Sequence, residues 1–313
     1  MGDDAAVLDE GGEYLSLITT DAFVEGVHFD RAYASFYQIG WKAMAANLSD
    51  IAAMGGSPCV ATSTLAAKED ESVEDIEALY QGMDDVGQRF HCEIVGGDTV
   101  SSPGPMMLSV ALLGKVSKNR LTPRSAAQVG DLVCVTGHLG ASAAGLRVLR
   151  ERPGAIRTED ETEAIKKHLE PVPRLGEAAL LTQTGAVHAM IDISDGLSSD
   201  LHHVCAQSHV GAVILEEQIP IDAGTERIAD SCQCSALEFA LSGGEDFELL
   251  FTVSPQGADR CMRDGRATVI GEIVARSGGV TLRRRNGTVE CIPRSGYQHF
   301  SKEDVVETLQ RTQ

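Results

Sequence analysis

The amino-acid sequence alternates short apolar runs with longer segments in which apolar residues recur at a helical period. Residues 14–20 and 60–65 are runs of the first kind, and each is typical of a buried strand. Residues 35–54 carry apolar side chains three and four positions apart and predict a helix, which Gly55 and Gly56 then end. This alternation predicts a mixed α/β fold in which helices cover sheets.

The length of the chain and a local change in its charge indicate two domains. A chain of 313 residues is long enough for two cores. Four cations between Lys115 and Arg124 interrupt a strongly acidic sequence close to Pro123. We place the domain boundary there, with an N-terminal domain of residues 1–118 and a C-terminal domain of residues 119–313. Each domain is expected to be a mixed sheet covered by helices.

The net charge and the cysteines exclude several classes of function. The 26 Lys and Arg residues against 46 Asp and Glu residues give a charge of −20, which disfavours nucleic acid or an anionic membrane surface as a partner. No apolar run approaches the ~20 residues that a membrane span needs. The first residues also lack the basic and apolar regions of a signal peptide. Eight scattered cysteines without a CxxC pair are typical of a cytoplasmic protein with reduced thiols.

Aspartates recur at turns that follow apolar strands or break helices, beside Gly, Ser or Thr. One such aspartate is ordinary, because aspartate caps helices and starts turns. Six placements exceed what capping alone explains, and in open α/β folds such turns meet at the carboxyl ends of strands. Clustered carboxylates repel each other unless cations join them, and hard oxygen ligands favour Mg²⁺ or Mn²⁺ over zinc. The six segments are residues 3–4, 19–21, 48–50, 96–99, 192–196 and 243–246.

The common nucleotide-binding signatures are absent from the sequence. It contains no GxxxxGK[ST] loop, no GxGxxG motif and no protein-kinase motifs. Residues 136–142 form a glycine-punctuated helix entry whose backbone N–H groups could bind a phosphate. A plain turn between a strand and a helix is the simpler interpretation of that segment.

Taken together, these segments resemble the thiamine-monophosphate kinase family, of the superfamily that includes aminoimidazole ribonucleotide synthetase and selenophosphate synthetase. The similarity covers nearly the whole chain, with the same order and spacing. The glycine–aspartate motifs belong to the superfamily as a whole. His28 in its context, residues 242–246 and the C-terminal Gly-Tyr-x-His-Phe indicate the thiamine branch. The matching stretches are residues 2–7, 19–29, 41–55, 96–99, 135–137, 142–146, 193–197, 241–246 and 296–300.

The resemblance implies ATP-dependent phosphorylation of thiamine monophosphate to thiamine diphosphate, assisted by several Mg²⁺ ions. It also implies a homodimer formed through the N-terminal domains, which bind ATP and Mg²⁺, while the C-terminal domain completes the nucleotide and substrate site. The implied magnesium ligands are Asp4, Thr19, Thr20, Asp21, Asp50, Asp98, Asp192 and Asp195. The implied ATP contacts are Gly97, Asp98, Arg124 and Ser194, and the implied borders of the thiamine monophosphate site are His28, Glu245 and Tyr297.

The chemistry of this reaction agrees with the residues. The acceptor is a phosphate monoester that is already mostly a dianion at neutral pH, so we expect no general base and no catalytic residue of that kind. The obstacle is repulsion from the ATP polyphosphate, since two unit charges 4 Å apart cost about 4 kcal/mol at an effective dielectric of 20. Metal ions held by carboxylates offset that repulsion and hold the nucleophile and the leaving group in line.

Two other functions fit the same residues. The first is another ATP-dependent synthetase of the superfamily, although the chain lacks the N-terminal Lys or Cys that such enzymes often use. The second is a catalytically silent protein that binds divalent cations. Family members usually carry a leader before the Gly-Asp-Asp motif, so we expect such a leader to precede Gly2 and to order Asp4. Two further departures from the family are Ala141, where an Asp is usual, and residues 126–129, which lack a cation near Arg124.

Several of these residues also have purely structural interpretations. His28 could be a strand-end histidine bonded to the backbone, Tyr297 could cover the edge of a core, and Glu245 could cap a turn. We expect Trp41 to pack within its helix and Glu248 to face solvent from its strand.

Overall fold

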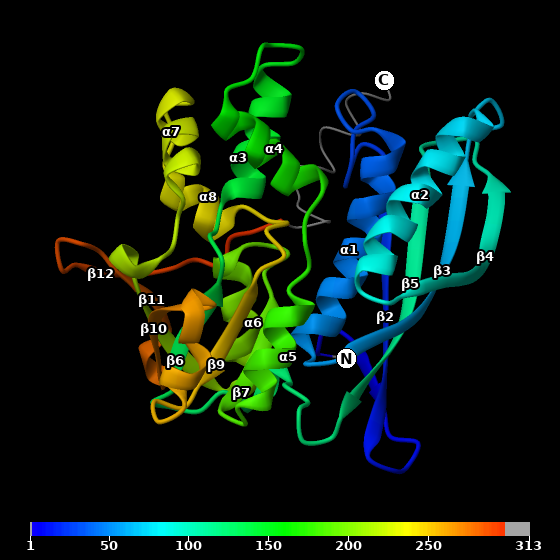
Figure 1. The fold of residues 1–313 in the computed structure, drawn as a ribbon. Coiled ribbons are helices and arrows are strands. Elements are labelled where there is room, and N and C mark those ends of the chain that lie inside the picture. Colours follow the sequence, from blue (N-terminus) through cyan, green and yellow to red (C-terminus); the bar gives the residue numbers. More distant parts are fainter. Residues whose placement is uncertain (1, 298–313) are drawn as a thin grey trace.

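The computed structural model describes residues 2–297, and its N-terminal half is a five-stranded sheet covered by two helices (Figure 1). The elements are β1 (Ala6–Leu8), β2 (Tyr14–Val24), α1 (Phe36–Ala53), β3 (Ser57–Ala67), α2 (Val73–Arg89), β4 (Glu93–Ser101) and β5 (Met107–Ser117). The strand order is β1-β2-β5-β3-β4. Only β3 and β4 are parallel among the described neighbours, because α2 connects them as a crossover.

The two helices of this half approach each other unusually closely. A capping box formed by Ser35 and Gln38 starts α1, and Ser72 caps the start of α2. A Cβ atom added to Gly40 would lie 1.9 Å from the carbonyl oxygen of Leu79, and one added to Gly82 would lie 1.9 Å from that of Tyr37. Glycine at these two positions therefore allows the helix backbones to touch.

The two faces of the N-terminal sheet differ in what covers them. In β2, Leu15 and Leu17 point to the helices and are buried, whereas Ile18 points to the other face and is 41% exposed. The register places Ile18 opposite Leu113 of β5, which is 42% exposed. We call this uncovered side of the sheet the open face.

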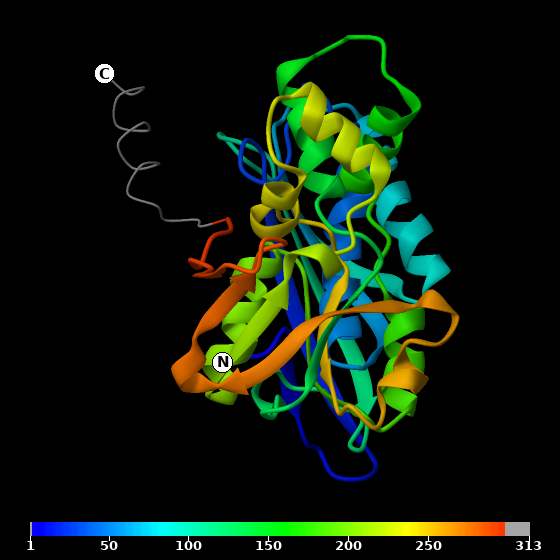
Figure 2. The ribbon, with the colours of Figure 1, turned by 90° about the vertical axis from the view of Figure 1, so that its left-hand side faces the viewer.

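In the part of the chain that the structure describes, the C-terminal half contains a seven-stranded sheet and seven α-helices that pack around it. Its strands are β6 (Leu132–Thr136), β7 (Val187–Asp192), β8 (Val210–Leu215), β9 (Leu249–Val253), β10 (Ala267–Ala275), β11 (Val280–Arg283) and β12 (Val289–Cys291). Its helices are α3 (Ala141–Glu151), α4 (Glu159–Leu169), α5 (Leu175–Gln183), α6 (Leu197–Ser208), α7 (Ala223–Ser231), α8 (Ala236–Ser242) and α9 (Ala258–Cys261). The strand order is β12-β11-β8-β10-β6-β9-β7. Helices α3, α4, α7 and α8 gather at one end of this sheet, as both views show (Figures 1 and 2).

The two halves share one apolar core through α1. The largest cluster of buried apolar side chains contains residues of α1, such as Met44 and Leu48, together with Leu175 of α5 and Phe251 of β9. The indole N–H of Trp41 donates to the carbonyl oxygen of Pro171 at 2.8 Å. Trp41 therefore joins the two halves, in addition to the packing within its helix that we expected.

The described residues show whether any helix could span a membrane and whether the cysteines form disulfides. Within residues 2–297, no helix combines the length and the apolar character that crossing a membrane would require. All eight cysteines are free thiols.

The sequence located most elements, and the exceptions have physical causes. The sequence also predicts a strand at residues 132–136 and helices at residues 141–151 and 197–208, and β6, α3 and α6 have these bounds. The expectation that Glu248 faces solvent was wrong, because its carboxylate is buried and accepts hydrogen bonds from Arg174 Nε at 2.7 Å and Thr136 Oγ1 at 2.6 Å. The sequence predicts a strand over residues 247–253, but β9 begins at Leu249, and the loop before it contains Glu245 and Phe247 with left-handed backbone angles.

The contact between α1 and α2 predicts an unusual response to alanine. In an exposed helix Gly→Ala adds up to ~1 kcal/mol of stability, but in Gly82→Ala the new methyl group would meet a backbone oxygen, so we expect a net loss of ~1–3 kcal/mol. Gly176→Ala in α5 is the matched control, because nothing lies within 4 Å of its Cβ position, and it should stabilise by ~0.5–1 kcal/mol. Denaturant unfolding measures both, and equal effects of the two substitutions would contradict the packing argument.

Candidate active site

A cavity of about 950 Å³ lies between the two halves of the molecule, and we call it the interdomain cavity. Its N-terminal wall is formed by β2, the following turn and one face of α1. Its C-terminal wall is formed by α3, the loop after β7, the loop after α8 and residues 296–297. A cleft between two rigid units is a common place for small substrates.

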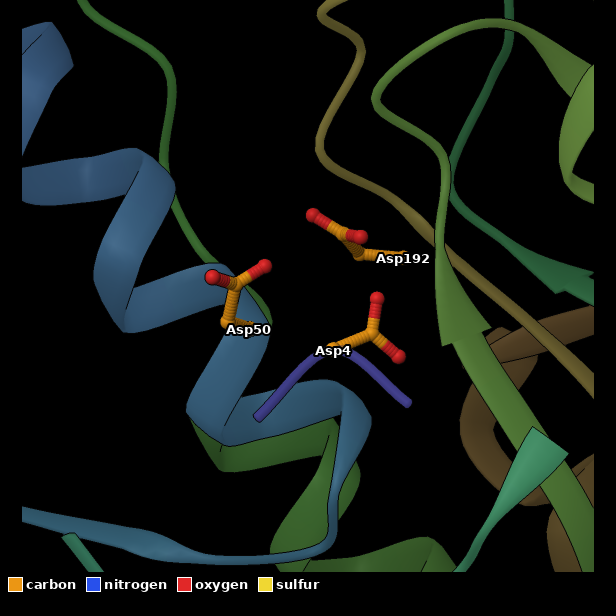
Figure 3. A group of neighbouring side chains, drawn as sticks. All are labelled: Asp4, Asp50 and Asp192. Carbon is orange, nitrogen blue, oxygen red and sulfur yellow. The ribbon is translucent and has the colours of Figure 1, made fainter. Parts of the chain in front are cut away.

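Three carboxylates converge at this cavity, and we call them the aspartate cluster. Asp4 comes from the N-terminal segment, Asp50 from α1, and Asp192 from the end of β7 (Figure 3). One oxygen atom of each lies within 4.8 Å of the others, and the side chains point toward one another. Segments that are distant in the sequence and belong to both halves of the molecule are thus brought to one point.

Neighbouring side chains orient these carboxylates. Ser49 Oγ donates to Asp192 Oδ2 at 2.7 Å, and the hydroxyl of Thr19 donates to Asp50. Arg124 binds the Asp4 carboxylate with two nitrogen atoms, one of them Nε at 3.1 Å. Arg124 is therefore tied to the aspartate cluster and is not a solvated linker charge.

The electrostatics of the aspartate cluster are unfavourable without a cation. Burial raises the pKa of Asp50 and Asp192 well above the ordinary value, and the neighbouring carboxylates raise both further. Burial, followed by the charge of Asp4, raises the pKa of Asp21 to about 6. Hard oxygen ligands held close together suit Mg²⁺, so the donor set fits the ion that the resemblance implies.

The structure brings most of the remaining candidate residues to the interdomain cavity. Asp195 belongs to a loop that Asp200 fixes, because Asp200 Oδ2 accepts from the backbone N–H groups of Asp195 and Gly196 at 3.2 and 3.1 Å. His28 Nδ1 accepts from the backbone N–H of Val24 at 3.0 Å. The candidates that line the cavity are Thr20, Asp21, His28, Asp50, Asp192, Ser194, Asp195, Glu245 and Tyr297.

Gly97 and Asp98 are not among the residues that line this cavity. They line a separate groove between β4 and α2, together with Tyr80 and Asp84. Asp98 is paired with Thr64 of β3, Thr64 with Ser109 of β5, and Ser109 with Ala22 of β2. The side chains of this row point to the open face. Three strand spacings of ~4.8 Å separate Asp98 from β2, so within one chain it lies apart from the aspartate cluster.

The helix entry at residues 136–142 does not offer its donors to a phosphate. The carboxylate of Asp246 accepts from the backbone N–H groups of Gly140 at 2.7 Å and Ser142 at 3.2 Å. The side chain of Asp246 therefore occupies the N-terminus of α3, which agrees with the simpler interpretation of this segment as a plain turn between a strand and a helix. Burial raises the pKa of Asp246 to about 7, although the two N–H groups favour its charged form.

Two polar residues at the site were missed in the sequence. Lys42 of α1 is 3% exposed, and its Nζ lies 2.7 Å from Glu245 Oε1. His168 of α4 is equally buried, and its Nδ1 lies 3.0 Å from Ser142 Oγ. A lysine among the apolar residues of a buried helix was the available signal, since a buried ammonium group needs a partner.

Comparison with known proteins identifies the family. The family model for the N-terminal domain of AIR synthase related protein matches residues 2–116, and the model for its C-terminal domain matches residues 128–283. Thiamine-monophosphate kinase of Bacillus subtilis (strain 168) is 34% identical over 306 residues, covering 96% of this chain and 93% of that relative. The chain belongs to the thiamine-monophosphate kinase family. The enzyme of this name from Synechococcus elongatus is 39% identical over 308 residues, covering 96% and 91% of the two chains.

Solved structures of thiamine-monophosphate kinases have the same fold. AaThiL, complexed with AMPPCP and TMP, has a TM-score of 0.87 at 33% identity, with 96% of this chain and 92% of that chain covered. The thiamine-monophosphate kinase of Stenotrophomonas maltophilia K279a has a TM-score of 0.80 at 33% identity, with 90% and 89% covered. The predictions of a two-domain mixed α/β fold, of this family and of a phosphotransferase are confirmed. The exact boundary between residues 118 and 119 stays a prediction.

The buried carboxyl group that caps α3 predicts a dependence of stability on pH. Because the folded-state pKa of Asp246 is about 7 against an ordinary 3.8, the folded state favours the protonated form. Its contribution to the free energy of unfolding is therefore greatest below pH ~4 and falls by ~2–4 kcal/mol as the pH rises to about 7. Asp246→Asn should flatten the pH profile between these values. Urea unfolding of both proteins at several pH values measures the difference, and parallel profiles would contradict it.

Proposed function

We propose that this chain transfers the γ-phosphoryl group of ATP directly, in line, to the phosphate of thiamine monophosphate, giving thiamine diphosphate, with several Mg²⁺ ions. The observation that carries this proposal is the aspartate cluster, in which carboxylates from three separate segments converge at the interdomain cavity. The similarity to AaThiL, which was solved with AMPPCP and TMP, supports ATP and thiamine monophosphate as the two substrates.

The side chains of the aspartate cluster would hold the magnesium ions. Asp4, Asp50 and Asp192 supply carboxylate oxygens, and Asp21 and Asp195 line the same cavity. Bound magnesium would neutralise the phosphate charges that otherwise repel each other. The chain contributes the orientation of the ligands, through the hydroxyl groups of Thr19 and Ser49 and the guanidinium group of Arg124. Transfer would then depend on positioning and charge neutralisation.

The rest of the cavity suits an acceptor that is partly apolar. Phe23, Val27, Leu146 and Phe239 line it, and they would exclude water around the rings of thiamine. His28 accepts a backbone hydrogen bond at Nδ1, which orients its ring at the border of the cavity. We propose that His28, Glu245 and Tyr297 border the acceptor.

The position of Asp98 supports a homodimer as the active form. Asp98 lies on the open face of β4, away from the aspartate cluster of its own chain, whereas Gly97 is aligned with buried Ser63 on the side that the helices cover. The open face also carries exposed Ile18, Leu113 and Val100, and apolar side chains on an uncovered sheet are typical of an interface. A second copy docked on the open face would bring its Asp98, an implied ATP contact, toward the site.

One assay separates this proposal from the two alternatives. The purified chain is incubated with ATP, Mg²⁺ and thiamine monophosphate, and thiamine diphosphate is measured. Its formation supports the kinase. ATP turnover that needs a different acceptor supports another synthetase of the superfamily, and metal binding without turnover supports a catalytically silent cation-binding protein.

The aspartate cluster predicts opposite effects on stability and on turnover. Asp50→Asn removes a charge that is repelled by its neighbours, so stability should be unchanged or raised. Losing about 3–4 kcal/mol of transition-state stabilisation should slow turnover ~10²–10³-fold. The control Asp230→Asn removes one charge from the exposed surface of α7 and should leave turnover unchanged. Thermal unfolding and steady-state kinetics measure both effects, and near-normal turnover in folded Asp50→Asn would refute the metal role.

A mixing experiment tests whether Asp98 acts across the dimer. We expect Asp50→Asn and Asp98→Asn homodimers to be nearly inactive. In a heterodimer of the two variants, one site combines intact Asp50 with intact Asp98 and the other combines both substitutions. Random exchange of equal amounts should therefore restore about a quarter of wild-type activity. No restoration after exchange, verified by native mass spectrometry, would show that Asp98 serves its own chain or another purpose.

A further inference from the structure

The side chain of Glu245 is held in place by the opposite half of the molecule. Glu245 belongs to the loop after α8, and Lys42 belongs to α1. Lys42 Nζ lies 2.7 Å from Glu245 Oε1, and Lys42 is 3% exposed against 27% for Glu245. The lysine is thus hidden behind the carboxylate, which is the member of the pair that lines the interdomain cavity.

The surroundings of this pair leave one carboxylate oxygen available. Lys42 Nζ also lies 3.5 Å from His168 Nε2, and His168 Nδ1 lies 3.0 Å from Ser142 Oγ. His168 Nδ1 is 3.5 Å from Glu245 Oε2, beyond an ordinary hydrogen bond. Since a carboxylate accepts several hydrogen bonds, Oε2 keeps the capacity to accept one from a bound molecule.

The backbone of Glu245 is fixed as firmly as its side chain. Its φ angle of 67° is in the left-handed region, which a glutamate adopts only when its surroundings impose it. Its N–H donates to the carbonyl oxygen of Ser194 at 2.8 Å, and Phe247 N–H donates to that of Ile193 at 3.0 Å. The loop that presents Glu245 is therefore bonded to the loop that follows Asp192.

Helix α1 connects this pair to the aspartate cluster. Lys42, Ala46 and Asp50 are spaced four residues apart and share one face of α1, and Ala46 lines the cavity between the other two. Eight residues of helix correspond to ~12 Å along the axis. One rigid helix thus fixes the separation between the metal-binding end of the cavity and the Glu245 end.

We propose that Lys42 is a positioning residue that holds Glu245 to accept a hydrogen bond from the amine-bearing pyrimidine of the acceptor. This inference rests on the proposed function, because it takes the acceptor phosphate to lie at the aspartate cluster. The acceptor is then recognised at both ends of α1, its phosphate near Asp50 and its amino group at Glu245. A phosphate ester that lacks the amine-bearing ring would leave the carboxylate without its partner and would be disfavoured.

The test compares two acceptors and two pairs of variants. The acceptors are thiamine monophosphate and the phosphate ester of its hydroxyethylthiazole half, which lacks the pyrimidine. For Lys42→Met we expect the KM for thiamine monophosphate to rise about 10–50-fold, with kcat reduced less than about threefold and the KM for ATP unchanged. With the thiazole phosphate the same substitution should change KM less than about twofold. The control is Lys68→Met, because Lys68 is exposed and lies directly after β3; this substitution should change none of these values.

Several results would overturn the inference. A merely structural Lys42 would change kinetics equally for both acceptors, and an irrelevant one would change neither. If Lys42→Met does not fold, Glu245→Gln is compared with the double variant Lys42→Met/Glu245→Gln, which leaves no lone buried charge. The two should share the same raised KM for thiamine monophosphate, and a further rise in the double variant would show that Lys42 acts elsewhere. Failure of the proposed function is distinct, because the wild-type chain would then form no thiamine diphosphate.

Discussion

Crowding of carboxylates that have been taken out of water is the constraint on which this site depends. Asp50 and Asp192 belong to different halves of the molecule, yet they lie with Asp4 inside one small volume. Each such pair costs several kcal/mol, and the hydroxyl groups of Ser49 and Thr19 offset only part of that cost. The structure tolerates the arrangement because the apolar core is continuous through α1. The aspartate cluster therefore lowers the stability of the folded chain locally.

The fold could be predicted where the local signal was strong, and not where tertiary contacts decide. Helix α6 follows a Gly-terminated turn and has clear periodicity, so its bounds were predicted correctly. Helices α7 and α8 were not predicted from the sequence, because α7 buries only Thr225, Ile228 and Ala229 and α8 only Ala240, so neither has a broad apolar face. The burial of Glu248 was not predicted because its partner Arg174 lies 74 residues away in the sequence, and no local pattern indicates that ion pair.

The residues of the candidate site likewise divide into those that a local sequence pattern indicated and those that only the folded chain brings together. The aspartates were singled out because they lie beside small residues such as Gly, Ser or Thr, a pattern that repeats along the chain, although Asp50 lies within α1 and Asp4 precedes β1. Their companions could not be found, because Lys42 and Glu245 are joined only by the folding of the whole chain. The side of the sheet on which Asp98 lies depends on a register irregularity between Ala61 and Thr62. Such a bulge reverses which side chains face the helices, and the sequence carries no signal for it.

The straight course of α1 between the two ends of the cavity limits how this family can vary. An α-helix turns ~100° and rises 1.5 Å with each residue. A single residue inserted or deleted between Lys42 and Asp50 would therefore swing one of them around the helix, away from the cavity, while the other stayed in place. Compensation would require a whole extra turn, which would separate the two ends by several ångströms. We therefore expect homologues to vary more in the loops that surround the cavity than in the number of residues in this stretch of helix.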